Sequence, residues 1–343
     1  MQEEKYFWGD RSTVRLNKNI KIILNYVLGP LVFLLLSYFI YVQVIHQPNW
    51  RSSLDQVWAA VTGPWKWRWW LVVLLMPLNW GIEARKWQLA LRPIGGIRYR
   101  DAFRAIFTGT TMASFTPNRM GEYLGRLLYI KEGKRIASIS LTIVCSIAQL
   151  LITLLAGLGG LLYLYYFQRG PVSSAHLGFW LNALLGLTAV LLASLTIIYF
   201  RLSWLLGKLS KIPRWGRHLD PVKVLENFEL RILLRILFLS FVRYWVFIVQ
   251  YALLFPLFGV VLSFGQVAGG MSVVFLVMAV VPTFTFLTEL GIRWEAGIQV
   301  LELFSANAIG IFATSFAIWV INLIIPALVG SLLILSIKLF KSK

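Results

Sequence analysis

Apolar runs of about twenty residues recur along the whole chain, separated by shorter segments rich in Lys and Arg. A helix that crosses a bilayer needs about 20 predominantly apolar residues. Hydrophobic residues make up 58% of the 343 residues and charged residues only 14%, whereas a soluble domain carries roughly 25% charged residues. The segments between the runs hold too little apolar sequence for a separate core. The sequence therefore predicts an all-α fold, a polytopic membrane helical bundle.

Six runs are expected to cross the bilayer completely. They are 24–45, 69–91, 138–167, 178–200, 236–258 and 308–339. Two other apolar stretches, 102–117 and 268–288, contain Gly and Pro and run into charged residues. We expect these two stretches to be re-entrant or broken-helix elements, because non-helical backbone at membrane depth is tolerated only against protein or a polar cavity.

The basic residues lie mainly between the apolar runs. The net charge of +19 would favour nucleic acid as a partner in a soluble protein. Here, a cytoplasmic N-terminus and two re-entrant elements place 27 of the 33 Lys and Arg residues on the cytoplasmic side, as the positive-inside rule favours. We therefore expect a multi-pass protein of the cell (inner) membrane with both termini cytoplasmic and no nucleic-acid partner. The two re-entrant elements then enter from opposite sides, an inverted-topology arrangement found in transporters.

A charged turn follows the first re-entrant element. It holds two helix-breaking residues, Pro117 and Gly121, and four polar candidates, Asn118, Arg119, Glu122 and Arg126. Charge at the centre of a membrane helix costs about 2.5–3.5 kcal/mol on insertion scales, so such residues usually have a function. An arginine beside a broken helix suits a phosphate, which a guanidinium binds through two hydrogen bonds. The alternative is an ordinary basic cytoplasmic turn.

A second charged group ends the second span, where Arg85 and Lys86 follow Glu83. The alternative is an interfacial anchor of long side chains that reach toward water. Glu83 fits that alternative poorly, because an anchor needs no acid. Arg243 is a further charge within a predicted span, and the sequence assigns it no partner.

The third charged group follows the second re-entrant element. Glu289 and Arg293 are four residues apart, Gly291 lies between them, and Pro282 precedes them. We expect Pro282 and Gly291 to break the helix. The alternative is a local turn closed by an i,i+4 ion pair.

The three charged groups, in their order and spacing, resemble the flippase-like membrane region of lysylphosphatidylglycerol synthases. The matching residues are Arg85, Lys86, Trp87, Pro117, Arg119, Gly121, Glu122, Arg126, Pro282, Glu289, Leu290, Gly291, Ile292 and Arg293. The resemblance covers roughly residues 20–340 and implies translocation of lipid between leaflets. The synthases also carry a soluble aminoacyl-transferase domain, so lysyl transfer is not implied. The domain organisation is then a cytoplasmic segment 1–23, a flippase-like transmembrane domain 24–340 and a tail 341–343.

The predicted function is the flipping of an anionic lipid or lipid-linked headgroup, with its phosphate held by intramembrane arginines. The candidate headgroup-binding residues are Arg85, Lys86, Asn118, Arg119, Glu122, Arg126, Glu289 and Arg293. Neither a catalytic residue, a cofactor nor a metal site is expected, and transport would be downhill or ion-coupled. One alternative is a membrane-embedded transferase that uses a lipid-linked donor, with Glu83 or Asp101 as acid or base. The other is a non-catalytic partner of envelope-lipid biosynthetic enzymes, and the chain could act as a homo-oligomer.

Overall fold

A computed structural model describes residues 34, 38, 55, 58–167, 175–201, 225, 228–281 and 286–335 of the chain. This part is helical and contains no β-strand. Four of its helical segments are long and apolar enough to cross a membrane: Glu132–Tyr166, Leu181–Phe200, Leu230–Phe258 and Ala308–Ile334. The chain is therefore an all-helical protein with the helices of a membrane protein.

These four segments coincide with four of the six predicted spans, at 138–167, 178–200, 236–258 and 308–339. The predicted span 24–45 lies outside the described residues, apart from two isolated positions. The predicted span 69–91 is helix α4, Lys66–Ala90. With 25 residues it equals α11 in length, but it is not among the four because Glu83, Arg85 and Lys86 interrupt its apolar character.

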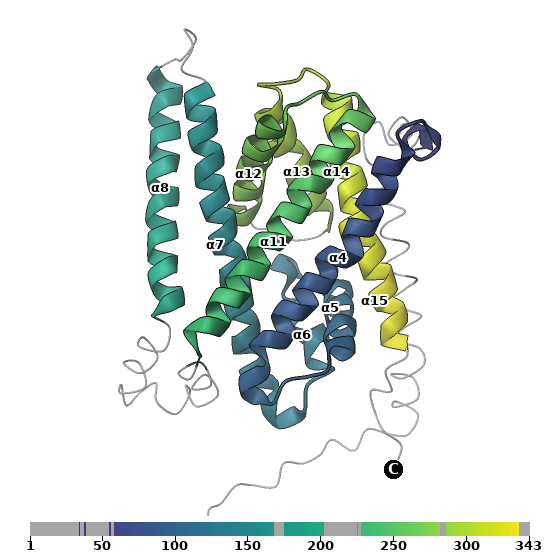
Figure 1. The fold of residues 1–343 in the computed structure, drawn as a ribbon, viewed down its shortest axis with the longest axis vertical. Helices are drawn as coiled ribbons and strands as arrows, with labels where there is room; N and C mark the ends of the chain where they lie inside the picture. The colour runs from purple at the N-terminus through teal and green to yellow at the C-terminus, as the bar shows by residue number, and fades with distance from the viewer. Residues whose placement is uncertain are drawn as a thin grey trace, which may run out of the picture.

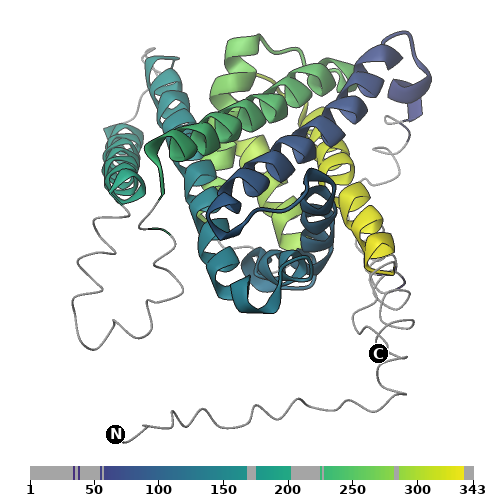
Figure 2. The same cartoon turned by 60° about the horizontal axis from the view of Figure 1, so that its bottom comes forward.

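The described helices fall into two halves of the same plan, each a long helix, a pair of shorter helices and another long helix. The first half consists of α4, α5 (Tyr99–Ala113), α6 (Gly121–Leu127) and α7 (Arg135–Phe167). The second consists of α11 (Leu230–Leu254), α12 (Phe264–Val280), α13 (Phe286–Leu301) and a last helix made of α14 (Ala308–Trp319), the π-helical turn η6 (Val320–Ile324) and α15 (Ile325–Leu335). Along the chain, α8 (Ala175–Phe200) comes between the two halves. It packs on α7 and lies at the edge of the molecule in both views (Figures 1 and 2).

Short 3-10 turns join several of these helices. They are η1 (Arg92–Ile94), η2 (Pro117–Arg119), η3 (Glu132–Lys134) and η5 (Phe255–Phe258).

The two helix pairs occupy opposite ends of the molecule, with α5 and α6 in the lower part of Figure 1 and α12 and α13 in the upper part. The two halves contact each other through equivalent helices. The first helix of each pair packs on the last long helix of the other half, α12 on α7 and α5 on α15, and the two initial helices α4 and α11 pack on each other. This exchange brings the turn η2 of the first pair and the start of α13 to the centre of the bundle.

Sequence explains why the first pair folds as a hairpin. The backbone N–H of Gly121 donates to the Thr116 hydroxyl at 2.6 Å, which satisfies a free N–H at the start of α6. A Cβ on Gly121 would lie 2.1 Å from the carbonyl oxygen of Met112, so only glycine fits there. Further along, Gly109 of α5 and Gly125 of α6 touch backbone to backbone. These glycines set the close approach of the two helices.

The second pair begins at a capping box, in which Ser263 and Gln266 each bond the other's backbone N–H at the start of α12. This satisfies two donors that the first turn of a helix leaves free. The glycines of the two predicted re-entrant stretches, Gly109 and the Gly269-Gly270 pair, do not break their helices. Both α5 and α12 run through these glycines, which instead allow close packing. Gly269, for example, packs against Tyr163 of α7.

The last long helix widens at its middle into the π-helical turn η6. Pro326 follows this turn and has no N–H to donate to the carbonyl of Asn322, so the regular i→i−4 ladder fails at this point. A π turn of this kind often marks a functional site. Here it turns Asn322 toward α11, where the Asn322 amide donates to Gln250 Oε1 at 3.1 Å.

Candidate functional site

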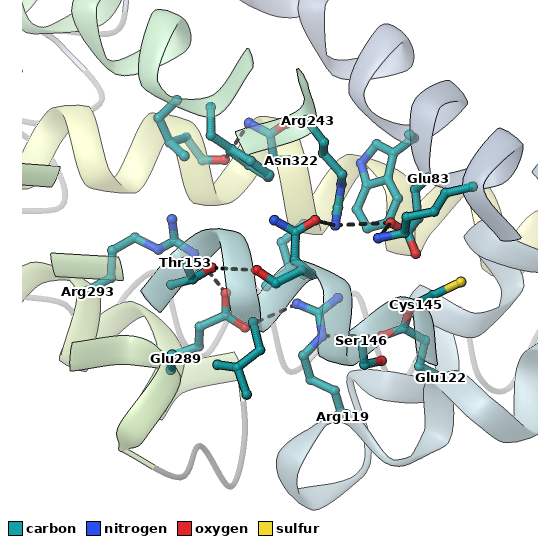
Figure 3. Close-up of a pocket in the computed structure, with 18 of the residues that line it drawn as sticks. Glu83, Arg119, Glu122, Cys145, Ser146, Thr153, Arg243, Glu289, Arg293 and Asn322 are labelled. Atoms are coloured by element: carbon teal, nitrogen blue, oxygen red, sulfur yellow. Dashed lines mark hydrogen bonds and ion pairs between the residues drawn. The ribbon is translucent and has the colours of Figure 1, made fainter. Parts of the chain in front are cut away.

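A cavity of about 340 Å³ lies where the turn of the first hairpin and the start of α13 meet α4, α7, α11 and η6. Its lining is unusually rich in charge for the interior of a helical bundle. The charged residues that line it are Glu83, Lys86, Arg119, Glu122, Arg243, Glu289 and Arg293. Figure 3 shows most of them converging from four different segments of the chain. Charge is expensive among apolar helices, so this convergence marks the candidate site.

On α4, Glu83 is the centre of a cluster of cations. Lys86 Nζ lies 2.7 Å from its Oε2, and Arg243 Nη1 from α11 lies 3.2 Å from the same oxygen. Arg126 Nη2 from α6 lies 3.1 Å from the other oxygen, Oε1. Glu83 is 5% exposed. One buried carboxylate therefore holds cations from three helices, and α4, α6 and α11 are tied together at this point.

The same pair of charged residues begins the second helix of each hairpin. In α6, Arg126 contacts Glu122 four residues before it, and in α13, Arg293 Nη2 lies 2.8 Å from Oε1 of Glu289, also four residues before it. Each arginine also reaches the initial helix of its own half. Arg126 reaches Glu83 of α4, and Arg293 donates to the Tyr251 hydroxyl of α11 at 3.0 Å. The two hairpins thus present equivalent Glu-x-x-x-Arg pairs to the cavity from opposite ends.

Arg119 of the turn η2 joins the first hairpin to the start of α13. Its Nε lies 3.8 Å from Glu122 Oε2 and its Nη1 lies 3.6 Å from Glu289 Oε2. Both separations exceed a normal hydrogen bond, and the Arg119 side chain is 34% exposed. Its backbone is unusual, with φ of 58° beside Asn118 at 49°. A non-glycine residue at positive φ stores strain that often accompanies a functional turn.

Arg243 enters the cavity from the α11 side, opposite Arg119 (Figure 3). Besides Glu83, it donates through Nε to Asn79 Oδ1 at 2.9 Å and contacts Gln149 Oε1 of α7 at 3.5 Å. Its guanidinium also lies over the Trp80 ring, 5.3 Å from the centroid. The neutral acceptors and the ring hold the guanidinium in place.

Neutral polar side chains complete the lining. Ser146, Gln149 and Thr153 follow one face of α7 at spacings of three and four residues, and Asn322 faces them from η6. Such groups bond a polar ligand without adding charge. The carboxylates of the site already contact cations, so the arrangement favours an anion over a metal ion as its ligand.

Most of the predicted site residues come together. Lys86, Arg119, Glu122, Glu289 and Arg293 line the cavity, and Arg126 contacts two of the lining carboxylates, Glu83 and Glu122. The remaining two predicted residues, like Arg126, are not part of the lining. Arg85 is exposed and bonds Gln88 on the outer face of α4, and Asn118 is exposed in the turn.

The predicted helix breakers had mixed outcomes. Pro117 begins the η2 turn, and Gly121 begins α6, so both lie at a real break. Gly291 does not break a helix, because α13 continues through it from Phe286 to Leu301. Pro282 lies outside the described residues.

Sequence reasoning left out several residues of the site. Glu83 was noted in the second charged group and as an acid of the rival transferase, but it was not among the candidate headgroup-binding residues, and Arg243 had no partner. The Glu-x-x-x-Arg repeat at 122–126 and 289–293 was a signal for the equivalence of the two turns. The pairing of Arg243 with Glu83 has no such signal, because 160 positions separate them and only the packing of α4 on α11 unites them.

The fold and the site together define an all-helical membrane protein with a buried charged cavity between two opposed helical hairpins. Comparisons with models of protein families, with curated proteins and with solved structures found no match for this chain. Its function is therefore argued from the site itself.

Proposed function

We propose that the chain translocates an anionic lipid, or a lipid-linked anionic headgroup, between the leaflets of the cell membrane. The observation that carries the proposal is the ion pair between Arg119 and Glu289 across the cavity. This weak, partly exposed contact joins the turn of the first hairpin to the start of α13 in the second, and the two hairpins come from opposite ends of the molecule. A site at the meeting point of two opposed broken elements is what alternating access requires. The resemblance to the membrane region of lysylphosphatidylglycerol synthases supports the same function.

The proposed topology has six full spans and two re-entrant hairpins, α5–α6 and α12–α13, with both termini cytoplasmic. α4 is then one of the six spans, and its Glu83 and Lys86 face the cavity instead of lipid. The hairpin α5–α6 enters from the cytoplasmic side and α12–α13 from the other. This arrangement puts the Lys- and Arg-rich connections on the cytoplasmic side.

The proposed mechanism uses the weakness of the Arg119 contacts. A phosphate group that enters the cavity replaces the carboxylates as the partner of Arg119, because a guanidinium binds phosphate through two parallel hydrogen bonds. Arg119 then releases Glu289, and the two turns separate on one side of the cavity. The volume of about 340 Å³ lies at the small end of ligand pockets, which suits a headgroup whose acyl chains remain in the bilayer.

The test is translocation by the purified protein in vesicles that contain an acyl-labelled anionic lipid, followed by quenching of the label from outside. We expect Arg119→Ala and Arg293→Ala each to slow translocation at least tenfold. The double variant should be little slower than either single one. Arg119 and Arg293 both contact Glu289, and residues that share one partner couple by about 0.5–3 kcal/mol. Arg100→Gln, an exposed change at the start of α5, is the matched control.

Two results would contradict the proposal. Protein-containing vesicles that exchange the lipid no faster than empty ones would remove transport as the function of the isolated chain. A covalently altered lipid after incubation would instead favour the transferase alternative.

A further inference from the structure

The charges around the cavity do not balance. Among the described residues, three carboxylates face five cations, namely Lys86, Arg119, Arg126, Arg243 and Arg293. The closest contacts assign one cation to each carboxylate: Lys86 to Glu83, Arg126 to Glu122, and Arg293 to Glu289. Two guanidinium groups remain in excess, those of Arg119 and Arg243.

These two arginines differ from the three assigned cations in their surroundings. Arg119 has only ion pairs of 3.6 and 3.8 Å. Arg243 shares Glu83 with two other cations and donates its shortest hydrogen bond to the neutral Asn79 Oδ1. They extend into the cavity from opposite sides, Arg119 from the first hairpin turn and Arg243 from α11 (Figure 3).

We infer that the site binds a ligand with two negative charges, a terminal phosphate monoester or a diphosphate, between Arg119 and Arg243. This inference rests on the lipid function proposed above and narrows its ligand. A buried charge without a counter-charge is costly, and a dianion removes both excess charges at once. A phosphodiester carries a single charge and leaves one arginine unbalanced.

The chemistry of phosphate supplies a pH test. A phosphate monoester has a second pKa of about 6, so it carries close to two charges above pH 7 and one charge below pH 5. Arginine keeps its charge over this whole range. Preference for the monoester should therefore be strong above pH 7 and disappear as the pH falls through about 6.

The experiment is equilibrium binding by calorimetry to the full chain in detergent, with dioctanoyl phosphatidic acid as the monoester and dioctanoyl phosphatidylglycerol as the diester. At about pH 7.5 we expect the monoester to bind at least tenfold more tightly, and at about pH 5 we expect the two to bind equally. Arg119→Gln and Arg243→Gln should each abolish the preference, and Arg100→Gln should keep it. Equal binding of both lipids at pH 7.5, or a preference that survives both glutamine variants, would overturn the inference.

A lysine variant separates loss of the charge from loss of the fold. Arg243→Lys keeps the charge and loses the planar pair of donors, so it should bind both lipids more weakly and still prefer the monoester. Loss of the preference in a folded Arg243→Lys protein would overturn the charge argument.

Inorganic phosphate separates the two sources of the same chemistry. We expect it to compete with phosphatidic acid only at concentrations at least tenfold higher. Equal affinity would overturn the assignment to a lipid and indicate a soluble phosphate compound. The translocation assay reports separately on the function: monoester preference without translocation would contradict only the function, and equal transport and binding of both lipids would contradict only this inference.

Discussion

Glu83 shows how this site is built at the scale of single residues. Its one negative charge serves Lys86, Arg126 and Arg243, all within 3.2 Å. Arg126 is 1% exposed and also lies over the Trp87 ring, 5.6 Å from the centroid. A buried pair whose partner is removed leaves a charge that neither water nor protein compensates. The cluster therefore makes α4, α6 and α11 depend on each other.

Arg126→Ala should lower the free energy of unfolding by about 3–5 kcal/mol, because it removes the closest cation of Glu122 and one of the three cations around Glu83. The matched control is Arg135→Ala. Arg135 pairs with Glu132 at 3.9 Å, but both side chains are well exposed, so the control should lose at most about 1 kcal/mol. Unfolding of both variants in the same detergent measures the difference. Equal stability of Arg126→Ala and the control would mean that water reaches this arginine.

The turn between α5 and α6 is the element that presents Arg119. Two consecutive residues in it, Asn118 and Arg119, have positive φ. The left-handed region costs most residues roughly 1–2 kcal/mol, and asparagine tolerates it better than others. An asparagine at position 118 therefore lowers the conformational cost of a turn in which two consecutive residues have positive φ. The role of Asn118 is to shape the backbone of the turn, since its side chain is exposed and does not line the cavity.

Substitutions at Asn118 test this backbone role. Asn118→Gly should leave unfolding in detergent nearly unchanged, because glycine adopts positive φ without steric cost. Asn118→Val should lower the free energy of unfolding by about 1–2 kcal/mol and also slow translocation, because the turn would present Arg119 differently. A headgroup-binding role of the amide would instead make the glycine variant as inactive as the valine one.

At the scale of the whole molecule, the sequence predicts elements better than it predicts their contacts. The four long apolar segments were predictable because length and hydropathy decide a membrane helix. The turn of the first hairpin was predictable from Pro117 and Gly121. Gly291 misled the prediction because a glycine within a helix costs only about 1 kcal/mol, which the packing of α13 on α12 and α14 readily offsets.

Positions on one helix face explain another part of the outcome. Lys86 lies three residues after Glu83 and shares its face, whereas Arg85 lies two residues after it and points away. The helical period alone could have separated these neighbours. The position of Arg243 could not have been predicted in this way, because its environment comes from α4 and α7, far away in the chain.

The last prediction concerns how the whole molecule stands in the membrane. The connection between α6 and α7 and the one between α11 and α12 lie at opposite ends of the bundle (Figure 1). Gly133 belongs to the first and has open space around it, and Val261 belongs to the second and is 85% exposed. Either position should accept a cysteine without disturbing the packing. Cys145 is the chain's single cysteine, so a Cys145→Ala background makes each new thiol unique.

In that background, we expect a membrane-impermeant maleimide to label Val261→Cys in intact cells and to label Gly133→Cys only in inverted vesicles. The reason is the charge distribution, since Arg135, Lys131 and Lys134 surround the first connection and basic connections stay cytoplasmic. Permeabilised cells, in which both thiols should react, control for accessibility. Labelling of both positions from one side would mean that the long axis of the bundle does not cross the bilayer. The two hairpins would then not open to opposite faces, and alternating access through Arg119 and Glu289 would have to be abandoned.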